Sequence, residues 1–258
     1  MFELFAMSLR EYWNEMNDGS SDVDQSIDEL KSVLSEHYGK EITWTEPDEL
    51  PNDDTEINVD VIDDRQLSSL HAIAAKLELD GNLDGLELDP EEPWECNVFD
   101  RLAEELDERD DENGLDKFAH LLSIGNSNEC ICLPVDLPFV AQINVDNDEE
   151  EEEHHCDCGD DECCCEEDDG CIDIASSVAI RRELDVIAKA LDLDPALVID
   201  EDTALSFDDE DPYRFARVGW YIMRDQIDNA IKEDIPLIMR FCDDDEYDEF
   251  DDDDADEA

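Results

Sequence analysis

Apolar residues recur at helical spacing through most of the chain. The stripe formed by Ile27, Leu30 and Leu34, for example, has the spacing of one helix face. On this pattern we predict helices over 4–17, 24–38, 70–80, 97–108, 184–194 and 213–232. Strand-like alternation covers 41–45 and 56–62, and short apolar runs lie at 130–137 and 235–241. The pattern therefore predicts an α+β fold that is dominated by helices and has a few short strands.

Two parts of the chain resemble each other. The segment LHAIAAKLELD at 70–80 aligns without gaps on LDVIAKALDLD at 184–194, and each copy is followed by an acidic loop with proline, a further helix and a short apolar run. The similarity suggests an internal duplication of about 70–137 and 184–241, although two amphipathic helices can also look alike by chance. We divide the chain into an N-terminal α/β segment (1–62), a first helical lobe (63–144), an acidic Cys-rich insert (145–171), a second helical lobe (172–242) and an acidic tail (243–258). The insert and the tail lack an apolar stripe, so we expect both to be disordered.

Negative charge is the most unusual property of the sequence. Its 258 residues include 81 acidic and 16 basic side chains, for a formal net charge of −65. The stretches 147–171 and 243–258 contain no Lys or Arg, but they hold only 26 of the acids, so the rest of the chain is acidic as well. Hydrophobic residues still make up 41 %, which is more than disordered acidic chains contain, and most of the chain should fold. Such a surface repels nucleic acid and anionic membranes and attracts cations and basic proteins.

The expected location follows from three features. The N-terminal sequence MFELFAMSLREYW lacks the basic start and the small-residue cleavage site of a signal peptide. No stretch approaches the roughly 20 apolar residues of a membrane span. Six of the ten cysteines lie between Cys156 and Cys171, unlike the dispersed cysteines of a secreted disulfide framework. We therefore expect a cytoplasmic protein.

The Cys-rich insert contains candidate zinc ligands, because thiolate and imidazole groups suit this ion. The candidates are His154, His155, Cys156, Cys158, Cys163, Cys164, Cys165 and Cys171. Their spacing is unlike the paired knuckles of structural zinc sites, and the nearby carboxylates should raise the thiol pKa values and so disfavour the thiolate. The alternative is a low-complexity acidic loop that binds no metal.

A second candidate metal site would bind calcium. The window DGNLDGLELDPE at 80–91 matches the EF-hand loop pattern, with Asp80, Asn82, Asp84 and Glu91 as oxygen ligands. Pro90 and Pro93 would hinder the exiting helix of such a motif. The alternative interpretation is an ordinary acidic turn.

No catalytic motif is recognisable. The run SIGNSN at 123–128 contains glycine and serine but lacks the spacing of nucleophile elbows and of phosphate-binding loops. A nucleophilic cysteine usually needs a positive surrounding that lowers its pKa, and the charge of this chain is negative. Carboxylates occur throughout, so pairs of them do not indicate acid–base catalysis. We expect a protein that is not an enzyme.

These observations favour an acidic interaction protein that binds a basic protein surface, for example that of a nuclease or another nucleic-acid-binding protein. Its acidic side chains could imitate the phosphate array of a nucleic acid. The protein could also be an immunity protein or inhibitor that binds a basic enzyme by the same electrostatics. As contact residues we propose Asp208, Asp209 and Glu210, beside the helix predicted at 213–232. One alternative is a protein adapted to high salt, and another is a metal-binding protein that uses zinc or calcium at the sites above. We expect no direct contact with nucleic acid or with a membrane.

Overall fold

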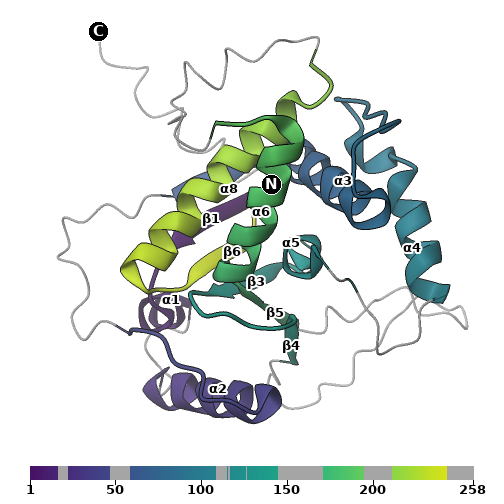
Figure 1. The fold of residues 1–258 in the computed structure, drawn as a ribbon. Helices are drawn as coiled ribbons and strands as arrows, with labels where there is room; N and C mark the ends of the chain where they lie inside the picture. Colours follow the sequence, from purple (N-terminus) through teal and green to yellow (C-terminus); the bar gives the residue numbers. More distant parts are fainter. Residues whose placement is uncertain are drawn as a thin grey trace, which may run out of the picture.

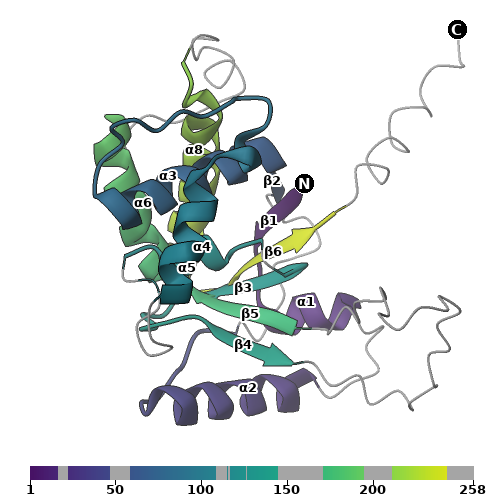
Figure 2. The same ribbon diagram turned by 90° about the vertical axis from the view of Figure 1, so that its right-hand side faces the viewer.

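The computed structural model describes residues 1–16, 23–46, 59–108, 115, 117–125, 127–144, 171–194 and 211–242. These residues form three layers, with a mixed β-sheet between two groups of helices (Figures 1 and 2). The larger group consists of α3 (Asp64–Asp80), the 3₁₀ helix η1 (Pro93–Glu95), α4 (Val98–Glu108), α5 (Ala119–Ser123), α6 (Ser177–Leu191) and α8 (Arg214–Glu233). The helices α1 (Leu9–Met16) and α2 (Val23–Tyr38) cover the opposite face. The predicted helix-dominated α+β fold is confirmed.

The sheet has six strands in the order β2-β1-β6-β3-β5-β4. Along the chain they are β1 (Phe2–Ala6), β2 (Val59–Ile62), β3 (Glu129–Leu133), β4 (Ala141–Asn144), β5 (Cys171–Ser176) and β6 (Leu237–Phe241). Neighbouring strands are antiparallel except for β3 and β5. The prediction of a helix from residue 4 is wrong at its start, because the first residues of the chain pair with β2 on one side and with β6 on the other. The predicted strand at 41–45 is also wrong, since Ile42 and Trp44 are buried without joining the sheet.

Alternation along the strands separates two hydrophobic cores. In β3, Cys130 and Cys132 face the side of α3, α6 and α8, whereas Ile131 and Leu133 face the side of α1 and α2. This is the period of two that a strand imposes on its side chains. Figure 2 shows the result, with helices stacked on both faces of the sheet. The sheet is therefore a buried central layer.

The helix α3 has strong end signals in its sequence. The side chain of Asp63 accepts the backbone N–H of Gln66 at 2.7 Å, and Gln66 Oε1 accepts that of Asp63 at 3.1 Å, which completes a capping box. At the other end Gly81 has a φ of 70° and donates its N–H to the Leu77 carbonyl.

Within the described ranges, no helix is both long and apolar enough to cross a bilayer.

The two predicted lobes share one sheet and one core. Strand β3 of the first lobe pairs with β6 of the second, and residues from both lie in the core beneath α3, α6 and α8. The duplication of 70–137 and 184–241 stays a prediction: α3 and α6 both pack on α8, but α4 has 11 residues where α8 has 20. The insert up to residue 170 and the tail from 243 lie outside the described residues, while Cys171, which we placed in the insert, begins β5.

Candidate functional site

A run of exposed acidic residues extends from the end of α3 to the end of α4. Residues 80–107, which we call the acidic segment, contain eleven acidic side chains and a single basic one, Arg101. The acidic residues, all of them exposed, are Asp80, Asp84, Glu87, Asp89, Glu91, Glu92, Glu95, Asp100, Glu104, Glu105 and Asp107. Figure 1 shows this part of the chain in blue to teal, at the edge of the molecule formed by α3 and α4. The acidic segment therefore presents a strongly negative surface.

Buried apolar side chains hold the acidic segment against the core. Leu86 and Leu88 are buried and alternate with the exposed Glu87 and Asp89. Further along, Val98 and other apolar residues of α4 belong to the core that includes α3. Because the apolar positions are anchored, the carboxylates between them have fixed backbone positions.

Side chain to backbone hydrogen bonds shape the loop that precedes η1. Asn82 Oδ1 accepts the backbone N–H of Asp84 at 2.9 Å, and Asp89 Oδ1 accepts that of Glu91 at 3.0 Å. Both are short turns of the kind that Asn and Asp stabilise. The loop is thus defined by local sequence as well as by burial.

Ion pairs fix the two ends of this loop. The carboxylate of Asp80 accepts hydrogen bonds from Arg101 at 3.0 Å and from Lys76 at 2.6 Å. These two bonds hold the pKa of Asp80 at about 2. Glu91 lies between Arg65 of α3, at 3.6 Å, and Arg214 of α8, at 3.5 Å. Asp80 and Glu91 therefore join secondary-structure elements to one another, and the other acidic residues of the segment provide its outward charge.

The same contacts bear on the predicted calcium loop. Two of its four proposed ligands, Asp80 and Glu91, are engaged by basic side chains, and the Asn82 amide donates to the Asp80 carbonyl at 3.0 Å. The chain continues into η1 at Pro93 in place of the exiting α-helix of an EF-hand. Across the part of the chain that the structure describes, no three His, Cys, Asp or Glu residues gather as metal ligands would. Calcium binding at 80–91 stays a prediction that this geometry does not favour.

The other predicted site residues are placed only in part. Of the eight candidate zinc ligands, Cys171 is described and lies in β5, where it pairs with Asn144. The remaining seven lie outside the described residues, as do Asp208, Asp209 and Glu210. Zinc binding and the contact role of 208–210 stay predictions.

The acidic segment was not predicted from the sequence as a continuous surface. Residues 80–91 were interpreted as a candidate calcium loop, although the charge continues through EEPWEC and the acidic face of α4. The alternation of leucine and acid at 86–89 was the available signal, because it predicts one buried and one solvent-facing row. Trp94 was also missed: it lies among these acids and is 49 % exposed.

Lys76, Arg65 and Arg214 offset the charges of Asp80 and Glu91, and two further arginines pair with acids elsewhere in the fold. Arg181 and Arg224 are bound by Asp185 and Asp228, which lie on the same two helices, α6 and α8. This network holds two helices together in a chain that repels itself, as exposed charge of one sign would otherwise separate them. Its arginines are thus occupied within the fold.

Comparisons with known proteins identify the family. Neither a search of curated proteins nor a search of solved structures finds a match. A family model described as "Putative DNA-mimic protein" matches residues 4–239, which span nearly all of the chain. The acidic segment lies within the matched range. The chain belongs to this family.

Proposed function

We propose that this chain is a non-enzymatic binding protein whose acidic segment occupies the nucleic-acid-binding surface of a basic protein. The observation that carries the proposal is the set of exposed acids in 80–107, which numbers nine besides the ion-paired Asp80 and Glu91. Membership of the family described as "Putative DNA-mimic protein" supports it. The partner would be a DNA-binding protein, such as a nuclease, and occupation of its site would inhibit it.

The spacing of charge on α4 supports this role. Asp100, Glu104 and Asp107 follow one another at helical intervals of four and three residues, so they lie along one side of the helix. With a rise of about 1.5 Å per residue, successive carboxylates are about 4.5–6 Å apart along the axis. One strand of duplex DNA carries one phosphate per roughly 3.4 Å of axis. The helix thus provides a row of charge with about two-thirds of the density of one DNA strand.

The acidic segment is pre-organised, which favours a defined interface over diffuse electrostatic attraction. The anchoring leucines, the Asn and Asp turns and the ion pairs of Asp80 and Glu91 all form within the folded chain. A surface whose backbone is already fixed loses less conformational entropy when it binds. The acidic segment therefore suits a defined interface.

Affinity capture at graded ionic strength tests the proposal. The immobilised full-length protein is expected to retain a DNA-binding protein at about 50 mM salt and to release most of it by about 200 mM, since contacts that replace phosphate contacts weaken steeply with salt. A variant with Glu95, Glu104 and Asp107 changed to Gln, Gln and Asn serves as the control bait. Retention of the same proteins by both baits would contradict the proposal, because binding would then not need the acidic segment.

A further inference from the structure

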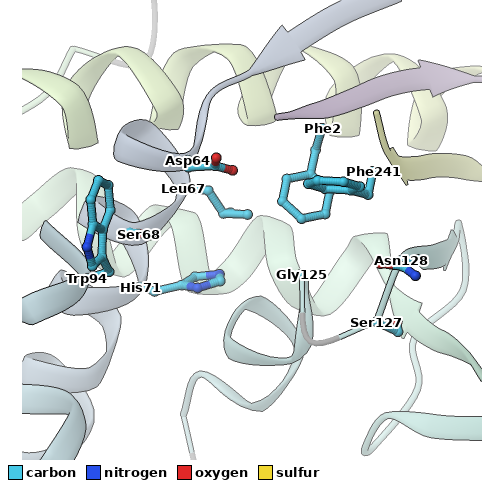
Figure 3. Close-up of a pocket in the computed structure, with 10 residues that line it drawn as sticks. All are labelled: Phe2, Asp64, Leu67, Ser68, His71, Trp94, Gly125, Ser127, Asn128 and Phe241. Carbon is cyan, nitrogen blue, oxygen red and sulfur yellow. The ribbon is translucent and has the colours of Figure 1, made fainter. Parts of the chain in front are cut away.

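A cavity of about 530 Å³ adjoins the acidic segment at Trp94. Its walls come from α3, η1, the ends of β1 and β6, and the chain that enters β3. Figure 3 shows Trp94 and His71 on one side and the rings of Phe2 and Phe241 on the other. The two phenylalanine rings pack edge to face with their centroids 5.5 Å apart. The cavity thus brings together residues from both ends of the chain and from its middle.

The floor of the cavity is closely packed. Gly125 has a φ of 80°, and a Cβ atom added there would lie 3.1 Å from Leu67 Cδ2 and 3.4 Å from Phe2 Cζ. Glycine is therefore required at this point both by its backbone conformation and by the space available. The shape of the cavity is built into the folded chain.

His71 supplies an unused hydrogen-bond acceptor at this cavity. Its Nε2 atom is buried and has no hydrogen-bond partner among the described residues, while the ring shares a hydrogen bond with the Leu121 backbone. Burial lowers the pKa of His71 to about 4, so the ring is neutral at neutral pH. In the tautomer that donates to the Leu121 carbonyl from Nδ1, Nε2 carries a lone pair. A buried polar atom left in this state costs free energy unless a ligand pairs with it.

Aromatic and acidic groups at the rim define what such a ligand would be. Trp94 is 49 % exposed and Phe241 40 % exposed, which leaves ring surface open to a partner. The Asp64 carboxylate, whose side chain is 61 % exposed, also lines the cavity and contacts the Met1 amino group at 3.5 Å. Glu92 and Glu95, both exposed, flank the Pro93–Trp94 pair in the sequence. Aromatic faces next to carboxylates favour a cation.

We propose that this cavity receives an arginine side chain of the basic partner, stacked on Trp94 and donating an N–H to His71 Nε2. The inference rests on the proposed function, because it names the group by which the partner is anchored to the acidic segment. A guanidinium is planar, stacks on aromatic rings and carries five N–H donors, whereas the ammonium of lysine is compact and strongly hydrated. A cavity with aromatic walls and a buried acceptor therefore selects arginine over lysine. A surface that only carries negative charge would not distinguish the two.

The test compares two hexapeptides of equal charge, one with three arginines alternating with glycine and one with three lysines in the same places. Binding to the full-length protein is measured by titration calorimetry at about 50 mM salt, and the Nε2 resonance of His71 is followed by NMR. We expect the arginine peptide to bind roughly tenfold more tightly, as stacking on a partly desolvated aromatic ring allows. Trp94→Ala should abolish this preference. Phe139→Ala, which removes an aromatic ring of similar exposure (44 %) beside α2, should leave it intact.

The outcomes separate this inference from the proposed function. Equal binding of both peptides, to the wild type and to Trp94→Ala alike, would overturn the arginine site and leave the acidic segment as a general electrostatic surface. A preference for arginine without any change at His71 Nε2 would also overturn it, since the cavity would then not be entered. Failure of both peptides to bind at low salt would overturn the arginine site together with the proposed function.

Discussion

Neutralising three carboxylates of the acidic segment is expected to weaken binding of the basic partner ten- to hundredfold. The variant changes Glu95→Gln, Glu104→Gln and Asp107→Asn, all at exposed positions of η1 and α4. A single exposed ion pair contributes up to about 1 kcal/mol, so three of them can supply the roughly 1.4–2.7 kcal/mol to which this loss of affinity corresponds. The dependence of log K on log salt should become shallower as well, because each lost contact removes close to one unit from its slope. Calorimetric titration at several salt concentrations measures both effects.

A matched variant on the opposite side of the sheet provides the control. This variant removes the same number and kinds of charge by Asp28→Asn and Glu36→Gln in α2 and Glu41→Gln just after it. All three positions are exposed. Figure 2 shows α2 on the far side of the sheet from α4. We expect less than a threefold change in affinity, since these charges only steer the encounter. If both variants lose affinity equally, net charge and not a defined face governs binding.

Trp220→Ala is expected to lower the free energy of unfolding by about 3–5 kcal/mol. Trp220 is 0 % exposed and lies in α8, in the core between the sheet and the helices α3 and α6. Its Nε1 donates to the Leu184 carbonyl at 2.8 Å, so the substitution leaves a cavity and also removes this side-chain hydrogen bond. Urea denaturation measures the effect, at one fixed salt concentration because the chain repels itself.

The exposed Trp94 gives the comparison for this second prediction. Trp94→Ala should change the free energy of unfolding by less than about 1 kcal/mol, as substitutions at exposed positions usually do. The pair thus separates a tryptophan that stabilises the fold from one that we assign to partner binding. Equal stability losses in the two variants would show that Trp94 is structural, and a negligible loss for Trp220→Ala would contradict its place in the core.

Local periodicity located most of the helices because each buries one continuous stripe, although α3 and α6 begin six and seven residues before the predicted starts. Leu70 and Ile73 of α3, and Leu184 and Ile187 of α6, recur at helical spacing in the sequence and are 0 % exposed. The error at residues 4–6 has a physical cause. The apolar spacing there fits a helix, but hydrogen bonds to β2 and β6 impose a strand, and the partner residues in β6 are more than 200 positions away. No local pattern contains that information.

For the candidate site, the sequence predicted the sign of the charge but not the position of the surface. The sequence indicated an acidic protein with a basic partner, and it placed the contact at 208–210, outside the described residues. It did not single out 80–107, where buried leucines alternate with exposed acids. The cavity could not be predicted at all, because Phe2, His71, Trp94 and Phe241 come together only when the two ends of the chain meet in the sheet.

Competition with duplex DNA tests the central claim most directly. The partner retained by the protein at low salt is bound to a labelled DNA duplex, and the full-length protein is added at constant ionic strength while DNA release is followed by fluorescence anisotropy. If the acidic segment occupies the DNA-binding surface, the protein should displace the duplex completely, and the variant with Glu95, Glu104 and Asp107 neutralised should need at least about tenfold higher concentration. A stable complex of partner, DNA and protein, formed with unchanged affinity for DNA, would contradict the account.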